Sequence, residues 1–303
     1  MQSGRLLSQA ESPFELLVGI IWTLMKHWTL MNKQVQYQDI NTNNILLASN
    51  YEHDYNYDFD FEQPEWEYLE EKLDELAREL EVPKWNETPD DPIKQNYKSI
   101  KKLTWESDLK CRLKFLERTI GVLGPKSFGF LLDMDLINTL TLCRNNAKDT
   151  HTHRTGTLSF MAARILQAKP NVPMPHTYLH DLESFFWVLL YTVAEHKEGG
   201  AELNEDALIV LSGLERFDPS ILSHVKYSLL FRIASGDINI ESFDTTWSKA
   251  LAPMIVEFAK WTYGILFEKP DLDSDSHFGT VLTIFLDAVK KLKARSEPGL
   301  KEM

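Results

Sequence analysis

Residues 35–47 have the sequence V-Q-Y-Q-D-I-N-T-N-N-I-L-L, in which Asp39 precedes Asn44 by five positions. The apolar run Ile45–Leu47 follows at once and predicts a strand. This spacing favours a carboxylate and a neutral amide on one short loop at the start of that strand. On such a loop Asp39 can accept a hydroxyl proton, and Asn44 can bind Mg²⁺ beside a phosphate. The simpler interpretation is a turn without chemistry, because Asp and Asn are common turn residues.

Three further stretches follow this loop, and each has a recognisable pattern. Residues 129–136 have the sequence G-F-L-L-D-M-D-L, which predicts a buried strand that ends in Asp133. Residues 154–162 have the sequence R-T-G-T-L-S-F-M-A. Residues 180–190 have the sequence H-D-L-E-S-F-F-W-V-L-L and open a strongly apolar helix. Each pattern alone is a weak signal, but their order along the chain is specific.

Taken together, the four stretches resemble the C-terminal lobe of a protein kinase. The last two are most similar to the fungal-type protein kinase family. The resemblance covers roughly residues 12–50 and 126–195 and is weaker towards the end of the chain. It implies a mainly α fold, namely a protein-kinase-like C-terminal lobe in which a helical bundle carries short β-hairpins at the catalytic loop. It also implies ATP-dependent phosphoryl transfer to Ser or Thr of a protein substrate, with ATP and Mg²⁺ as cofactors.

The resemblance gives five residues a role. Asp39 matches the catalytic base, while Asn44 and Asp133 match the metal ligands. Thr157 matches the threonine of the activation segment that steadies the base and the substrate-facing loop. Asp181 matches a supporting aspartate that caps the central buried helix and accepts hydrogen bonds from catalytic-loop amides. A plain helix cap explains Asp181 equally well.

Several positions depart from the kinase pattern. Gln38 stands where kinases have an arginine before the catalytic aspartate, so it cannot pair with a phosphorylated activation loop. Asn41 stands where many serine/threonine kinases have a lysine that contacts the transferred phosphate. Asp135 stands in the place of the glycine of Phe-Gly. Arg164 replaces the glutamate of Ala-Pro-Glu, which reverses the charge expected to anchor the activation segment.

The start of the chain has little room for a kinase N-terminal lobe. Only 38 residues precede Asp39, and a helix predicted over 14–31 uses half of them. None of the 13 glycines belongs to a G-x-G-x-x-G loop. We therefore expect the nucleotide-clamping lobe to be absent and this chain alone to have little activity, since losing one transition-state donor already lowers a rate by about 10²–10³.

Two other functions are compatible with these motifs. A catalytically inactive pseudokinase, acting as an interaction module, accounts for the missing lobe and for Arg164. A small-molecule phosphotransferase of the aminoglycoside type shares the Asp-to-Asn spacing and the later metal-binding Asp. The stretch 154–162 counts against this third function, because it is similar to a loop that faces a protein substrate.

The amino-acid composition limits which binding partners and which cellular location are expected for the protein. The chain has 303 residues, of which 43% are hydrophobic and 25% charged, with a net charge of −13. This acidic balance argues against nucleic acid or an anionic membrane as the main partner. Cys111 and Cys143 have no paired spacing, so neither a disulfide framework nor a secreted protein is indicated. The apolar run 16–25 is too short to span a bilayer. We expect an intracellular protein, cytoplasmic or nuclear.

A charged segment separates the first motif from the others. Residues 51–91 carry 16 acidic and three basic side chains, whereas residues 94–126 carry a basic block. We interpret 51–125 as a charged helical insertion in the hairpin before Asp133. Its charges indicate solvated faces or, as the sharper hypothesis, a docking surface for a basic partner.

The rest of the chain, 1–50 and 126–303, is predicted to form one kinase-like lobe. Its expected helices cover 14–31, 181–194, 207–214, 221–233, 248–267 and 277–292.

Overall fold

The computed structural model describes residues 4–32, 35–36, 39–48, 129–131, 138–139, 157–168, 174, 176–197, 201–267 and 274–296. All of them belong to one compact unit formed by residues 1–49 and 114–303, and residues 50–113 are grouped apart from it. The predicted insertion over 51–125 and the predicted metal ligand Asp133 lie outside the described residues. Both therefore stay predictions.

The described part is mainly helical, which confirms the mainly α character of the predicted fold. Its helices are α1 (Pro13–Asn32), α5 (Ala163–Gln167), α6 (Tyr178–Glu195), α7 (Glu205–Leu214), α8 (Pro219–Ser235), α9 (Trp247–Phe267) and α10 (Ser274–Ser296). Two short 3₁₀ turns are η1 (Leu7–Gln9) and η3 (Ile240–Ser242). Its strands are β1 (Gly4–Leu6), β2 (Val35–Gln36), β3 (Ile45–Ala48), β4 (Gly129–Leu131) and β5 (Asn138–Thr139).

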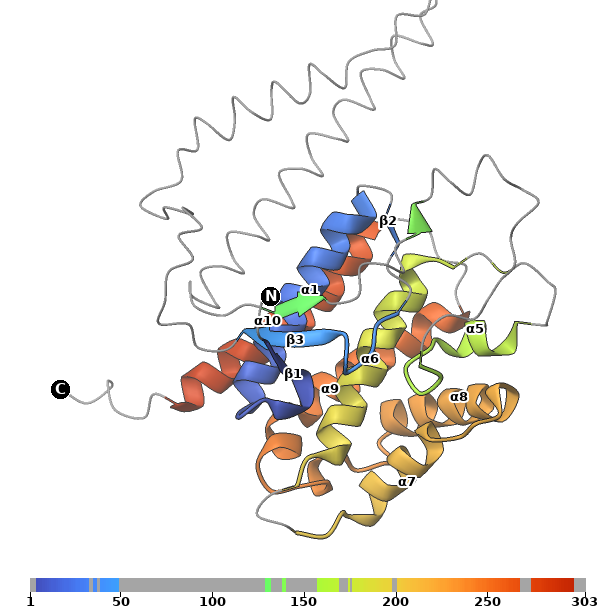
Figure 1. Cartoon of the computed structure of the whole chain (residues 1–303). Coiled ribbons are helices and arrows are strands. Elements are labelled where there is room, and N and C mark those ends of the chain that lie inside the picture. Colours follow the sequence, from blue (N-terminus) through green and yellow to red (C-terminus); the bar gives the residue numbers. More distant parts are fainter. Residues whose placement is uncertain are drawn as a thin grey trace, which may run out of the picture. The chain divides into compact units, whose positions relative to one another are not determined.

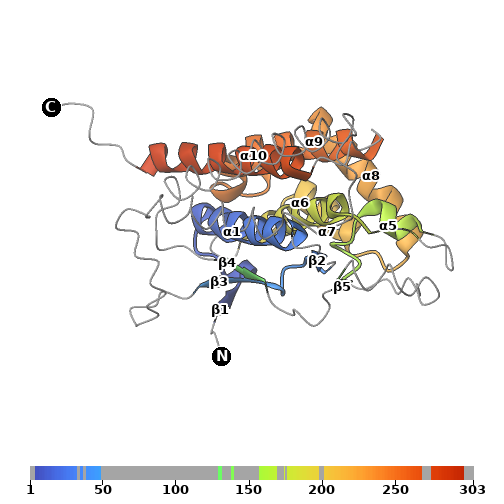
Figure 2. The ribbon, with the colours of Figure 1, turned by 90° about the horizontal axis from the view of Figure 1, so that it is seen from above.

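The strands lie on one side of α1, and α10 lies on its other side (Figure 2). Helix α6 packs against α7 and α9, while α8 packs against α5 and α9 (Figure 1). None of the described helices is both long and apolar enough to cross a membrane.

Helix α1 starts as its sequence predicts. The Ser12 hydroxyl accepts a hydrogen bond from the Glu15 backbone N–H at 3.1 Å, and Pro13 occupies the first helical position. This arrangement satisfies one of the N–H groups left free at a helix start, and proline removes another. Arg5 adds an ion pair to Glu15 and holds β1 against this end of the helix. The helix then runs towards β2 and the loop that carries Asp39.

Two small antiparallel sheets flank that loop. The first has the strand order β1-β3-β4, with Ile45 opposite Leu131 and Ala48 opposite Gly4. The second pairs β2 with β5. Strand β4 pairs with β3 across more than eighty residues of sequence.

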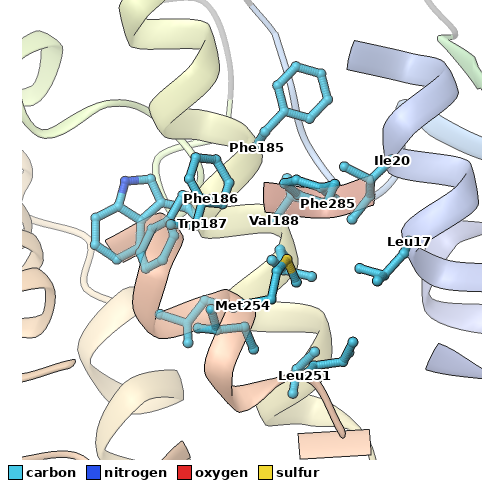
Figure 3. Packing of buried hydrophobic residues seen from close by; sticks show 14 of the residues in the cluster. Leu17, Ile20, Phe185, Phe186, Trp187, Val188, Leu251, Met254 and Phe285 are labelled. Atoms are coloured by element: carbon cyan, nitrogen blue, oxygen red, sulfur yellow. The ribbon is translucent and has the colours of Figure 1, made fainter. Parts of the chain in front are cut away.

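The centre of the core is α6. Its residues from Phe185 to Leu190 are all completely buried, as predicted for the apolar run that follows Asp181. Phe186 meets Phe258 of α9 edge-on, with ring centroids 5.4 Å apart. Figure 3 shows the side chains that gather around α6 from the neighbouring helices, namely Leu17, Ile20, Leu251, Met254 and Phe285. Burial of each large apolar side chain contributes about 1.5–3 kcal/mol.

The last four helices extend the predicted ranges by a few residues, because their ends are set by capping. Asn204 and Asp218 accept hydrogen bonds at the starts of α7 and α8, and Pro219 opens α8. Gly236 ends α8 with a φ of 85°, a conformation that favours glycine.

Gly19 is expected to be needed for the approach of α1 to β3. A Cβ atom at Gly19 would lie 2.4 Å from the Leu47 side chain, which is itself buried in β3. Gly19→Ala should therefore lower the free energy of unfolding by about 1–3 kcal/mol, although alanine is the better helix former. Chemical denaturation measures the difference.

Gly264→Ala is the matched control, because Gly264 also lies within a helix and a Cβ there meets nothing within 4 Å. It should raise the stability by up to about 1 kcal/mol. Equal effects of the two substitutions would show that the α1–β3 contact is not tight.

Candidate active site

The loop from Asp39 to Asn44 is organised by the buried side chain of Asn41. Its amide oxygen accepts hydrogen bonds from the backbone N–H groups of Asn43, at 2.9 Å, and Asn44, at 3.1 Å. Its amide NH₂ donates to the Asp39 carboxylate at 2.9 Å. One side chain therefore shapes the turn and fixes the carboxylate. The sequence analysis considered Asn41 only as a replacement for the lysine that many kinases have at this position. Its role in the turn was predictable, because an Asn side chain that accepts a hydrogen bond from the backbone N–H two residues later is a known turn signal.

Asp39 and Asn44 lie in direct contact. The Asn44 amide NH₂ donates to Asp39 Oδ2 at 2.8 Å and to the Asp39 backbone carbonyl at 3.1 Å. Among the described residues, each Asp39 carboxylate oxygen thus has one amide donor, which leaves a lone pair on each oxygen for another proton. Because both protons of the Asn44 amide point at Asp39, its amide oxygen faces away from this carboxylate. The contact between these two predicted residues is a geometric fact, and their catalytic roles stay predictions.

Asp181 lies at the start of α6 between two imidazole rings. His176 Nε2 is 2.6 Å from Oδ1, and His27 Nε2, from α1, is 3.1 Å from Oδ2. The first contact is a hydrogen bond, whereas the His27 contact is close but is not aligned as a hydrogen bond. Burial alone raises the pKa of the Asp181 carboxyl, but His176 and His27 hold that pKa below its ordinary value. Asp181 is therefore an ionised anchor between α1 and α6.

One part of the prediction for Asp181 is wrong. Helix α6 begins at Tyr178 with Thr177 as its N-cap residue, so Asp181 lies in the first turn and is not the cap. The capping bond comes from His180, whose Nδ1 accepts the Thr177 backbone N–H at 3.0 Å. Among the described residues, the partners of the Asp181 carboxylate are histidines and no amide of the Asp39 loop. His27 was missed because it lies 154 positions before Asp181 in the sequence, whereas His176 lies only five positions before it and belongs to no motif.

Thr157 lies at the start of a turn that leads into α5. Its backbone carbonyl accepts hydrogen bonds from the N–H groups of Phe160, at 2.9 Å, and Met161, at 3.2 Å. The residue itself is exposed, and within the described ranges no hydrogen bond joins its side chain to Asp39. The predicted role of Thr157 near a substrate thus rests on exposure, not on contact with the base.

Arg164 is anchored in a different way from the glutamate it replaces. Its guanidinium donates to the backbone carbonyl of Leu266 in the last turn of α9. The carbonyl groups at a helix C-terminus carry partial negative charge, so a cation is stabilised there. The reversed charge at this position therefore still ties α5 to the helical core.

A pocket of about 200 Å³ lies beside Arg164, between α6 and the end of α9. Its polar lining comes from Arg164, Thr177, His180 and Glu183. Burial lowers the pKa of His180 to about 4, and its Nδ1 is an acceptor, so the neutral ring carries its proton on Nε2.

Asp39 and Asn44 do not line this pocket. Within the described ranges, no group of three His, Cys, Asp or Glu side chains is arranged to bind a metal.

A comparison with protein-family models matches residues 118–193 to the fungal protein kinase family. No significant match was found among curated proteins or among solved structures. This match covers 76 of the 303 residues. It indicates a relationship to the fungal protein kinases through residues 118–193, in agreement with the resemblance of the motifs. The match includes the positions of Asp133, Thr157 and Asp181 and does not include Asp39 or Asn44.

Asn41→Ala is expected to lower the free energy of unfolding by about 1–3 kcal/mol. The substitution removes the acceptor of two loop N–H groups and one donor to Asp39, and buried groups left without partners are costly. Urea denaturation measures the change. Asn43→Ala is the control, because Asn43 is exposed, and it should stay within about 0.5 kcal/mol of the parent protein. If Asn41→Ala behaves like this control, Asn41 does not organise the loop.

The free energy of unfolding is expected to fall as the pH drops from 6.5 towards 4. His180 has a pKa of about 4 in the folded state against an ordinary 6.5, so in this window the unfolded chain binds a proton that the folded chain does not. The stability contributed by neutral His180 is complete above pH 6.5 and is lost towards pH 4, by up to about 3 kcal/mol. Asp181 acts in the same direction at lower pH, because its folded pKa lies below 3.8.

Urea denaturation across this pH range measures the slope. His180→Asn keeps an acceptor for the Thr177 N–H but does not titrate, so it should flatten the slope. An unchanged slope in this variant would assign the pH dependence to other groups.

Proposed function

We propose that this chain forms the catalytic-loop part of a fungal-type protein kinase and transfers the γ-phosphoryl group of ATP to Ser or Thr of a protein substrate. The observation that carries the proposal is the contact between Asp39 and Asn44 on one loop at the start of β3, with 2.8 Å between the amide and the carboxylate. The family match over 118–193 supports it independently, because that segment is far away in sequence.

In this proposal Asp39 is the base that orients the attacking hydroxyl. Its carboxylate is held in one orientation by the amides of Asn41 and Asn44 and keeps a free lone pair on each oxygen. A positioned base of this kind contributes about 10²–10⁴ in rate. Phosphoryl transfer depends mostly on such positioning and on charge neutralisation.

Asn44 and Asp133 are the proposed Mg²⁺ ligands. The amide oxygen of Asn44 fits this role, since oxygen ligands suit Mg²⁺ and the amide protons are used by Asp39. Asp133 follows Leu131 by two positions, and Leu131 is paired with Ile45, the neighbour of Asn44. Two residues of chain span at most about 7 Å, so this pairing supports a shared site. Mg²⁺, when bound, neutralises charge on the nucleotide phosphates.

The proposal includes ATP and Mg²⁺ as cofactors, a protein as substrate and an intracellular location. A basic partner at the acidic segment 51–91 remains a further proposal that rests on charge alone. The inactive interaction module is the main alternative, and nucleotide binding separates the two.

Asp39→Asn should lower the rate of phosphate transfer by about 10²–10⁴ without weakening ATP binding, because it removes the base and not a nucleotide contact. The assay follows phosphate transfer from Mg²⁺-ATP to a basic protein by the full-length gene product. Asp287→Asn, an exposed change of the same kind on α10, is the control and should leave the rate unchanged.

Nucleotide binding is measured in parallel as a thermal shift. ATP at about 100 times its Kd should stabilise the protein by about 2.7 kcal/mol. Binding without transfer would favour the inactive module, and neither binding nor transfer would end the kinase proposal. Equal rates for Asp39→Asn and the parent protein would remove Asp39 from the mechanism.

A further inference from the structure

The segment that follows Thr157 descends from the surface into the core within a few residues. Thr157 is exposed, whereas Met161, Ala162 and Ala163 are 7%, 1% and 0% exposed. Met161 and Ala162 form a small apolar cluster with Leu222 of α8, and this cluster is distinct from the main core. The position of the exposed end of the segment therefore depends on the contacts that hold its buried end in place.

Helix α5 begins at Ala163 and has no cap of its own. Its N-cap residue is Ala162, which offers no side-chain acceptor. Glu183 of α6 supplies the acceptor instead, since its Oε1 receives the Ala163 backbone N–H at 2.7 Å and the Trp187 indole N–H at 3.0 Å. A carboxylate at a helix start satisfies a free N–H and complements the positive end of the helix dipole.

Helix α8 holds the same segment from its other side with two buried polar side chains. The Ser223 hydroxyl donates to the Ala163 backbone carbonyl at 2.9 Å. The Lys226 ammonium group donates to the Met161 backbone carbonyl. Both side chains are completely buried, and they lie one helical turn apart on α8.

The burial of Lys226 is the unusual feature. A lysine is almost never fully buried unless its charge has a partner. Its Nζ lies 4.6 Å from the centre of the Trp187 ring, and the charge of Glu183 is also felt there. Burial lowers the pKa of Lys226 to about 7, against the opposite effect of Glu183. A neutral amine also carries N–H donors, so the bond to the Met161 carbonyl persists in either protonation state.

Apolar packing alone does not explain why a lysine occupies position 226. An apolar side chain could also pack against the Trp187 ring and would avoid the desolvation of an ammonium group. Only a long side chain that ends in a donor group can reach the Met161 carbonyl from this position. That carbonyl belongs to the segment that carries the exposed Thr157, four residues earlier.

We propose that Lys226, together with Ser223, is a positioning residue that fixes the substrate-facing segment 157–163 from below and so determines how a protein substrate is held. The inference rests on the proposed kinase function, because that function makes 157–163 the substrate-facing segment. The two side chains act through the backbone at Met161 and Ala163 and touch no reacting atom. Their hydrogen bonds add to the contact by which Arg164 ties α5 to the end of α9.

Lys226→Met and Ser223→Ala test the proposal in the full-length protein, singly and together. Methionine is nearly as long as lysine and apolar, but it cannot donate to the Met161 carbonyl. The controls are Lys249→Met and Ser228→Ala, two exposed changes of the same kinds on α9 and α8.

The first measurement is backbone hydrogen exchange, which requires no activity. Peptides that cover 157–168 should exchange about tenfold faster in each variant and faster still in the double variant, while peptides from α6 stay unchanged. Unchanged exchange at 157–168 would overturn the anchoring. If Lys226→Met does not fold, Ser223→Ala alone decides the same question, because it removes one hydroxyl and no charge.

The second measurement is steady-state phosphate transfer. The KM for the protein substrate should rise about tenfold, with the KM for ATP and the slow transfer to water unchanged. Equal losses for both substrates would show a merely structural role and overturn the positioning role. If the parent protein transfers no phosphate, the proposed kinase function fails and the substrate role fails with it, whereas hydrogen exchange still decides whether α8 anchors the segment.

Discussion

The structure depends on a constraint imposed by α6. All residues of this helix except Tyr191 and Glu195 are buried, so its buried polar side chains cannot be satisfied by water and need partners on the elements around them. Asp181 contacts His27 of α1 and His176, while Glu183 receives the N–H that starts α5. The same burial that provides the hydrophobic stabilisation thus fixes where α1 and α5 lie.

That constraint links the two regions that the sequence predicts to be functional. Helix α1 leads to the Asp39 loop, and α5 ends the segment that begins at Thr157. Both are attached to the first two turns of α6, through Asp181 and Glu183. In the proposed function, the base and the substrate-facing segment need a common rigid support to act together, because small misplacements cost much of the rate. One buried helix provides such a support for both.

The Asp39 loop itself is held locally. Asn41 and Asn44 donate to the carboxylate from within the same six residues, so the loop carries its own internal support. The departures from the usual kinase pattern are explained in the same way. Asn41 replaces a charged side chain with a turn-forming one, and Arg164 replaces an acidic anchor with a bond to the α9 carbonyl end. At Arg164 the anchoring of α5 is kept with the opposite charge, whereas at Asn41 a local structural role stands where kinases have a phosphate contact.

The sequence by itself determined the helices, the likeness to fungal protein kinases over 118–193 and the proximity of Asp39 to Asn44, because periodicity, capping and short-range spacing are local properties of the chain. Only the tertiary structure decided the partners of Asp181, the cap that Glu183 gives α5 and the burial of Lys226. These contacts join residues up to 154 positions apart, as between His27 and Asp181. A local sequence pattern does not predict these contacts. They form because packing around α6 excludes water from polar groups, which then need hydrogen-bond or ionic partners within the protein.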